Sequence, residues 1–260
     1  MNKFFSDLKK YSAYMRRAAQ SELNAEVANS YLNWIWWVLE PLCFMAIYAV
    51  IFSLFFKGKI EYLTAFIFLG ITIWEFFNVM LKTSVKLVRG NKAIVSKVYI
   101  PKYILLIEKM MRNGFKTVIS FCIVVVLMII YQVPLSWNVL WFFPVLLSFL
   151  IFTFGACALL MHFGVYVEDL ANITNIVLRL LFYMTGVFYN LADKVAGAWG
   201  YWLVRLNPLA LYLNSMRDAL LYGRTPNLRW LAAWTVVGLV LSYVGIRFIQ
   251  KNENSYVKVL

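Results

Sequence analysis

Three charged side chains lie inside long apolar stretches of the sequence: Glu40, Glu75 and Arg179. A charge is costly in the hydrocarbon of a bilayer, so such residues usually pair with one another or face a water-filled path. At 1.5 Å per residue, each lies roughly 9 to 12 Å from the inner boundary of its apolar stretch. We therefore predict that Arg179 pairs with Glu75 or Glu40, and that these residues either meet a polar substrate or hold helices together.

Aromatic side chains are the second group that can contact a substrate, since Phe, Trp and Tyr make up 18% of the chain. A flat aromatic face packs well against the C–H face of a sugar ring, and a rigid ring loses little entropy on binding. Many aromatic residues of membrane proteins pack at the lipid interface instead. The candidates for a substrate channel are Trp34, Trp37, Glu40, Glu75, Arg179, Tyr183 and Tyr189.

Motifs for nucleotide, metal or hydrolytic chemistry are absent from the sequence. It has no GxxxxGK[ST] phosphate loop, no GxSxG turn and no HExxH helix. Cys43, Cys122 and Cys157 are far apart, and His162 is the single histidine, so neither a metal site nor a disulfide framework is expected. We predict no catalytic residue, no metal and no cofactor bound by this chain.

The composition requires lipid as the solvent for much of the surface. Hydrophobic residues make up 63% of the chain and charged residues 14%, against about 45–50% and about 25% in soluble domains. The net charge of +13 does not indicate a nucleic-acid partner, because nine Lys and Arg lie between Lys82 and Lys116, beside apolar runs, with Glu108 as the one acid. That is the positive-inside pattern of membrane proteins.

Apolar runs long enough to cross a bilayer, about 20 residues each, are expected six times. The predicted spans lie near 32–56, 63–81, 112–132, 139–165, 172–190 and 229–248. With both termini cytosolic, the inner segments and their edges carry 17 of the 25 Lys and Arg and the outer segments carry seven. We predict an all-α integral membrane protein of six transmembrane helices, forming a single domain over residues 1–260.

Two further helical segments flank the spans. In residues 1–30, apolar side chains recur at helical spacing, as in a helix lying on the inner leaflet: Phe4, Leu8, Tyr11, Met15 and Ala19. Residues 191–228 are too long for a turn and too apolar for a free loop. Pro208 opens a helical pattern there, with Arg217 on its polar face, which predicts an outer re-entrant segment.

Five stretches of the chain, taken in order, resemble one family of membrane proteins. They are YLNWIWWVLEPL at 31–42, IVSKVYIPKYIL at 94–105, FGVYVEDL at 163–170, NPLA at 207–210 followed by Arg217, and ENSYVKVL at 253–260. They cover nearly the whole chain and are similar to the ABC-2 type permeases that export O-antigen, capsule and teichoic-acid polysaccharides. The chain departs from the family at Glu22–Glu26, where Arg and Lys are usual, and at Glu168–Asp169, where Arg-Asp is usual.

The resemblance implies a half-transporter that is not itself an enzyme. Two copies of this chain would assemble with two separate ATPase subunits, which use ATP with Mg, and move a lipid-linked glycan outward across the cytoplasmic membrane of a bacterium. In the family, the cytosolic segment after the second span carries a coupling helix, and the N-terminal helix would also contact the ATPase. We expect a short helix near 91–98, with coupling candidates Lys92, Val95, Lys97, Val98 and Tyr99.

Three other functions remain open on the sequence. An ABC-2 permease for a drug or a lipid would show the same spans. A membrane-bound transferase of the lipid-linked sugar pathway would need acidic or His groups at the membrane surface, where Glu168 and Asp169 are the one adjacent acidic pair. A structural membrane scaffold would need no site at all.

Overall fold

The computed structural model describes residues 2–55, 60–95, 97–191 and 198–259, which form helices and connecting turns with no strand among them. The α-helices are α1 (Asn2–Lys10), α2 (Ser12–Val27), α3 (Trp36–Phe55), α4 (Leu63–Gly90), α5 (Lys92–Val95), α6 (Lys102–Ile130), α7 (Phe142–Tyr166), α8 (Leu170–Thr185), α10 (Ala198–Leu206), α11 (Pro208–Leu220) and α12 (Leu228–Val259). Short 3-10 turns, η1 (Asn33–Ile35) and η2 (Trp137–Trp141), precede α3 and α7.

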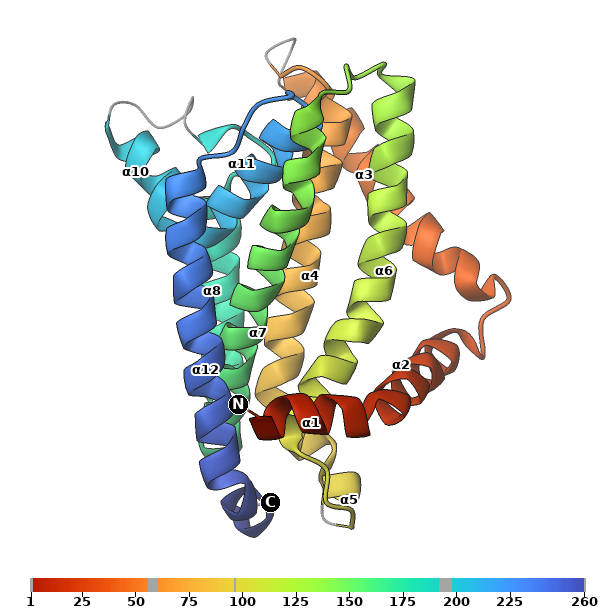
Figure 1. Ribbon diagram of the computed structural model, residues 1–260. Coiled ribbons are helices and arrows are strands. Elements are labelled where there is room, and N and C mark those ends of the chain that lie inside the picture. Colours follow the sequence, from red (N-terminus) through yellow and green to blue (C-terminus); the bar gives the residue numbers. More distant parts are fainter. Residues whose placement is uncertain (1, 56–59, 96, 192–197, 260) are drawn as a thin grey trace.

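The long helices α4, α6, α7, α8 and α12 run side by side along one axis (Figure 1). Helices α1, α2 and α5 lie at one end of this bundle, together with both ends of the chain, and we call it the inner end. Helices α10 and α11 lie at the opposite end, which we call the outer end. Helix α3 slants along the outside of the bundle, between the two ends (Figure 1).

Among the described residues, four helical segments are long and apolar enough to cross a membrane: Leu63–Gly90, Lys102–Ile130, Trp137–Tyr166 and Leu228–Glu253. They overlap the spans predicted near 63–81, 112–132, 139–165 and 229–248, although Leu63–Gly90 ends nine residues later than predicted and Lys102–Ile130 begins ten residues earlier. An integral membrane protein is therefore the class that this structure fits.

The fifth predicted span, 172–190, is shorter than expected. Helix α8 ends at Thr185 because Gly186 adopts a left-handed backbone conformation, with φ +71°. Its 16 residues give a length of about 24 Å, below the roughly 30 Å of a hydrocarbon core. The first predicted span, 32–56, corresponds to α3 and the turn before it.

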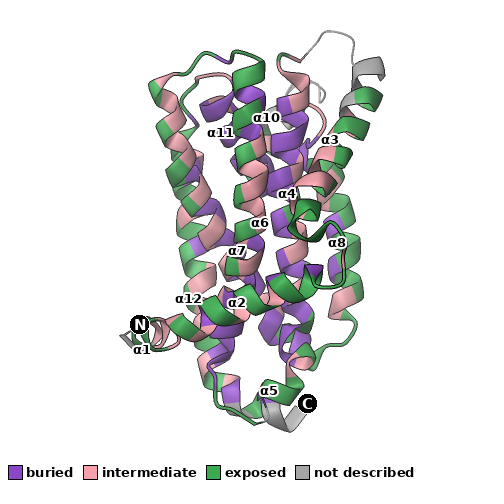
Figure 2. Cartoon of the chain, turned by 90° about the vertical axis from the view of Figure 1, so that its right-hand side faces the viewer, coloured by how far each residue is buried: buried purple, intermediate pink, exposed green. Residues whose placement is uncertain are grey.

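Helix α4 lies at the centre of the bundle, and 67% of its most apolar 18-residue stretch is buried. Its side chains pack against α6, α7, α8 and α11. Figure 2 shows the buried residues concentrated on α4 and around α11, whereas α3 and α8 are largely exposed. The residues of α3 and α8 therefore have the most surface free for a partner or a substrate.

Helices α7 and α12 pack closely through glycine. A Cβ added at Gly155 would lie 2.6 Å from the backbone nitrogen of Ser242, and one added at Gly245 would lie 2.7 Å from Cβ of Ala158. A Cβ added at Gly238 would lie 3.0 Å from Cα of Phe152 in α7. Small residues allow helix backbones to approach in a membrane, where packing rather than the hydrophobic effect holds helices together.

The amphipathic pattern of the N-terminus is present, and protein covers the apolar side of α2. In α2 the apolar face consists of Met15, Ala19, Leu23 and Val27, which are all buried. Helix α2 packs on the inner half of α6. Protein therefore covers the apolar face of α2, and the placement of this helix in the plane of the inner leaflet stays a prediction.

Candidate functional site

Helix α8 carries a line of polar side chains on an otherwise apolar surface. Asn172, Asn175, Arg179 and Tyr183 are all exposed, and their spacing of three or four residues places them on one side of the helix. Polar and charged groups facing lipid would be costly, so this side of α8 is suited to water, a polar ligand or a partner.

The two predicted channel tyrosines of this region lie together at the outer end of α8. Tyr183 is 71% exposed, and the hydroxyl of Tyr189 donates a hydrogen bond to the carbonyl oxygen of Tyr183. Between them in sequence, Phe188 packs on Tyr48 of α3 with ring centroids 4.8 Å apart. The outer parts of α3 and α8 are therefore joined through aromatic contacts.

The channel candidates before and within α3 divide into two kinds. Trp34 and Glu40 are exposed, and Glu40 lies on the same side of the helix as the exposed Phe44. Trp37 is half-buried and packs edge to face against Phe115 of α6, with ring centroids 5.7 Å apart. Its indole Nε1 is buried and finds no hydrogen-bond partner among the described residues. Trp37 thus lies between α3 and α6.

The ion pair expected for Arg179 does not form within the described part of the chain. Arg179, Glu75 and Glu40 are all exposed, and the ion pairs found among the described residues involve other side chains. The packing of α4 on α8 gives the reason, because Trp74 fills the contact with Phe182 at 5.1 Å between ring centroids. Glu75 follows Trp74 in α4, so its side chain points about 100° around the helix axis from the contact with Phe182.

The predicted coupling segment forms a short helix, α5, followed by a turn in which the amide of Val98 donates to the carbonyl of Ile94 at 2.9 Å. Val95 is buried in its own chain, so it anchors the segment from within. Lys92 and Lys97 are exposed. The apolar surface open to a partner consists of Ile94, Val98 and Tyr99, of which the last two are 55% and 56% exposed.

Tyr99 also ties this segment to the rest of the inner end. Its hydroxyl donates to Oε2 of Glu253 at 3.1 Å, and its carbonyl accepts from the hydroxyl of Tyr11 at 3.4 Å. Glu253 is buried near the end of α12, where its Oε1 lies 3.9 Å from Nζ of Lys102. The coupling segment, the N-terminal helices and the end of α12 therefore form one connected surface.

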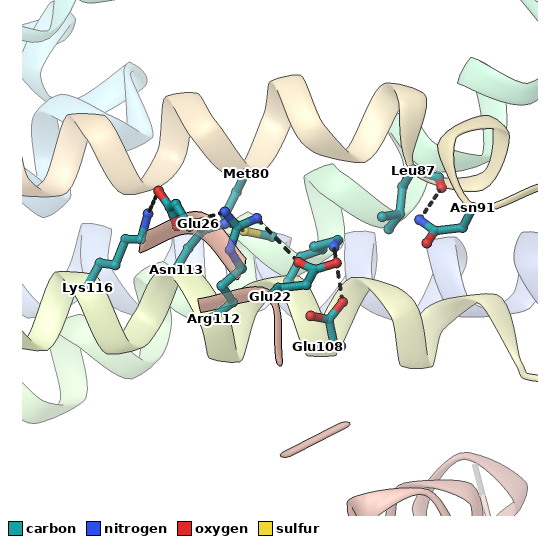
Figure 3. Close-up of polar contacts among 10 residues, drawn as sticks. Glu22, Glu26, Met80, Leu87, Asn91, Glu108, Arg112, Asn113 and Lys116 are labelled. Carbon is teal, nitrogen blue, oxygen red and sulfur yellow. Dashed lines mark hydrogen bonds and ion pairs between the residues drawn. The ribbon is translucent and has the colours of Figure 1, made fainter. Parts of the chain in front are cut away.

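A cluster of ion pairs fastens α2 to α6 (Figure 3). Arg112 donates to Oε2 of Glu22 at 3.3 Å and to Oε2 of Glu26 at 3.0 Å. Lys109 pairs with Glu22, and Lys116 pairs with Glu26. We call these five residues the α2–α6 clasp. The acidic residues that depart from the family pattern are thus the partners of a basic stripe on the chain's own α6.

The ion pairs of the clasp change the pKa of Glu26. Partial burial disfavours its charged form, but the hydrogen bonds from Lys116 and Arg112 outweigh that effect and lower the pKa of the carboxyl below its usual value. The sequence contained a signal for this pairing. Glu22 and Glu26 are one turn apart, and Lys109, Arg112 and Lys116 share a helix face by the same rule.

Arg217 is the functional candidate that the sequence pattern misplaced. It was expected on the polar face of the outer helix, but only 1% of it is exposed. Its guanidinium donates to the carbonyl oxygens of Phe66, Gly186 and Val187. Main-chain acceptors cannot be read from side-chain patterns, so only the cost of an arginine inside an apolar segment indicated a special role.

No metal centre is found in the part of the chain that the structure describes, where His, Cys, Asp and Glu nowhere form a group of three.

Comparison with known proteins agrees with this architecture. The profile of the family described as ABC-2 type transporter matches residues 18–221. A protein named O-antigen export system permease protein RfbA, from Klebsiella pneumoniae, is 26% identical over 240 residues, which is 92% of each chain. A protein of the same name from Myxococcus xanthus is 24% identical over 256 residues, or 98% of each chain. Because the profile covers well over half of its length, this chain belongs to the ABC-2 type transporter family.

Proposed function

We propose that the chain is the permease subunit of an ATP-binding-cassette exporter that moves a lipid-linked polysaccharide across the cytoplasmic membrane of a bacterium. The observation that carries this proposal is the exposed polar line on α8, which gives an apolar helix a side suited to hydroxyl-rich sugars. The names of the similar proteins, which are O-antigen export permeases, support the substrate class.

The working assembly is two copies of this chain with two ATPase subunits. A dimer is supported by the largely exposed surfaces of α3 and α8, which single chains would otherwise present to lipid together with their charged residues. In this arrangement α3, and α8 together with the residues that follow it up to 190, join the four long apolar helices to make six spans. Both chain ends lie in the cytosol, and α10 and α11 form the re-entrant outer segment.

The sugar path runs along α3 and α8. Arg179 meets the phosphates of the lipid carrier or polar groups of the glycan, because a guanidinium donates several hydrogen bonds in a fixed plane. Tyr183 and Tyr189 stack on sugar rings at the outer end. Glu40 and Glu75 accept hydrogen bonds from hydroxyl groups, and Trp34 lies at the inner entrance.

The ATPase subunits dock at the inner end. Ile94, Val98 and Tyr99 supply apolar contact, while Lys92 and Lys97 face acidic groups of the partner. ATP with Mg is used by that partner, in keeping with the missing phosphate loop in this sequence.

The test is co-purification of this chain with its candidate ATPase, reconstitution into liposomes, and measurement of ATP hydrolysis with and without lipid-linked oligosaccharide. Stimulation by the glycan is the expected result. A stable complex that responds to a drug or a lipid but not to the glycan would overturn the substrate class. Failure of any ATPase to bind would overturn the exporter proposal itself.

A further inference from the structure

The outer end of α8 is held by hydrogen bonds to its main-chain carbonyls. The last carbonyls of a helix have no partner within the helix and must find one elsewhere. Here the carbonyl of Met184 accepts from Nδ2 of Asn207 at 3.1 Å. The carbonyls of Gly186 and Val187 accept from Arg217 at 3.0 and 2.6 Å. We call Asn207 and Arg217 the outer lock.

The outer lock also reaches α4, so it joins three elements. Nε and Nη2 of Arg217 donate to the carbonyl of Phe66 at 3.3 and 3.0 Å, and the guanidinium lies 3.3 Å from the centroid of the Phe66 ring. Asn207 in turn caps α11, since its Oδ1 accepts from the amides of Leu209 and Ala210 at 3.0 and 3.4 Å. All the guanidinium nitrogens are therefore used, in a site closed to water.

The space around the lock admits no extra atom. A Cβ at Gly70 of α4 would lie 2.6 Å from Nη2 of Arg217 and 2.8 Å from the carbonyl oxygen of Val187. A side chain at Gly186 would be strained at φ +71° and would meet the carbonyl of Tyr189 at 2.9 Å. The outer end of α8 thus has a single position against α4.

The inner end of α8 has no comparable fastening among the described residues. Before the helix, Arg89 pairs with Glu168 at 2.6 Å and donates to the carbonyl of Val165 at 2.9 Å near the end of α7. The Glu168 side chain is 82% exposed. Exposed ion pairs contribute little to holding two segments together. Along α8 itself, only Thr174, Leu178 and Thr185 are buried.

We propose that Arg217 and Asn207 are positioning residues that make the outer end of α8 a fixed point, about which the helix turns while its inner end moves. The inference rests on the proposed function, because the movement is driven by closure of the ATPase subunits at the inner end. It assigns the lock a role in transport: Arg179 moves with the helix, while Tyr183 and Tyr189 stay near the pivot.

The experiment measures distances by double electron–electron resonance in the reconstituted complex. The native cysteines Cys43, Cys122 and Cys157 are first replaced by serine or alanine. One spin-label pair reports on the inner end, at Asn172→Cys and Lys251→Cys, and a second on the outer end, at Met184→Cys and Arg229→Cys; all four positions are exposed. Labelled chains are mixed with an excess of unlabelled chain, so that distances within one copy dominate.

Trapping the complex with ATP and vanadate is expected to shift the inner distance and leave the outer one unchanged. Equal shifts at both ends, or a shift at the outer end alone, would overturn the proposal. Since this comparison uses the native lock, it decides the question even where lock variants fail to fold.

Variants then test the residues themselves. Arg217→Met and Gly70→Ala are expected to shift or broaden the outer distance and to lower the amount of glycan exported per ATP hydrolysed. Arg217→Lys keeps the positive charge but not the planar guanidinium. We expect its outer distance and its export per ATP to lie between those of the native chain and of Arg217→Met. Arg224→Met is the matched control, because Arg224 is an exposed arginine of the same outer segment; an outer shift as large in this control would argue against the lock.

The two proposals fail in different ways. If the glycan does not stimulate hydrolysis but the inner distance alone shifts on trapping, the substrate is misassigned and the pivot stands. If the glycan stimulates hydrolysis while both distances shift equally, the exporter proposal is supported and the pivot proposal is overturned.

Discussion

The hydroxyl of Tyr99 donates a hydrogen bond to the carboxylate of Glu253 at 3.1 Å, which joins the coupling segment to the end of α12. Tyr99 is more than half exposed, whereas Glu253 is buried. One side chain therefore faces the proposed ATPase and also holds the inner end of its own chain together.

Tyr99→Asp is expected to reduce export strongly while ATP hydrolysis by the complex continues. The substitution removes an apolar contact for the partner and places a second carboxylate beside Glu253. Tyr99→Phe keeps the ring and loses only the hydroxyl, so a milder loss, equivalent to about 1 kcal/mol of lost hydrogen bonding, is expected. Export per ATP hydrolysed is the measurement. Equal losses in the two variants would show that the hydroxyl, and not the exposed ring, carries the effect.

Breaking the α2–α6 clasp is expected to destabilise the inner end in a salt-dependent way. Glu26→Lys leaves Lys116 without its partner, removes one of the two carboxylates that Arg112 contacts, and adds a like charge. We expect this to cost about 1 kcal/mol for each partly exposed pair that is lost. Thermal unfolding of the purified chain measures this. Adding Lys116→Glu should restore part of the lost stability, as a double-mutant cycle requires of a true pair. Asn24→Ala, on the exposed face of α2, is the control.

The clasp is also expected to depend on pH. The folded-state pKa of Glu26 is lowered from the usual 4.5, so its contribution to stability is complete above that value and is lost as the pH falls through the lowered pKa. The mobility of a spin label at Asn24 should therefore rise on acidification below about pH 4.5. Glu26→Gln should remove much of this transition, and an unchanged transition would assign it to other groups.

Substitution of the aromatic candidates should separate substrate contact from packing. Tyr183→Ala is expected to lower export with little change in stability, because Tyr183 is 71% exposed. Trp37→Ala is expected to cost about 2 kcal/mol of stability, since the half-buried indole packs on Phe115. Export assays and thermal unfolding are measured on the same preparations. Full export by both single variants and the double variant would overturn the aromatic path.

The long apolar helices could be predicted from the sequence because hydropathy is a local property. The position at which a helix ends depends also on contacts with residues far away in the sequence. The span expected at 172–190 stops at Thr185, because Gly186 reverses the chain and Arg217, 31 residues further on, holds it there. The sequence displays neither the conformation of Gly186 nor the main-chain acceptors of Arg217.

The N-terminal helices show a second limit of sequence reasoning. The pattern at Met15 and Ala19 predicted an apolar face, and that face exists. An amphipathic pattern does not say whether lipid or protein covers the face, and here α6 covers it. Glu22 and Glu26 carried the missing information, because their charges match the basic stripe of α6 and a lipid surface offers no such match.

The glycine contacts between α7 and α12 limit how these two helices can move relative to each other. Where a Cβ at Gly155 or Gly245 would overlap the neighbouring helix, no layer of large side chains separates the two helices. Sliding needs such a layer to repack, so α7 and α12 behave as one stiff frame. In the proposed mechanism, work done at the inner end reaches the glycan through α3 and α8, while this frame stays in place.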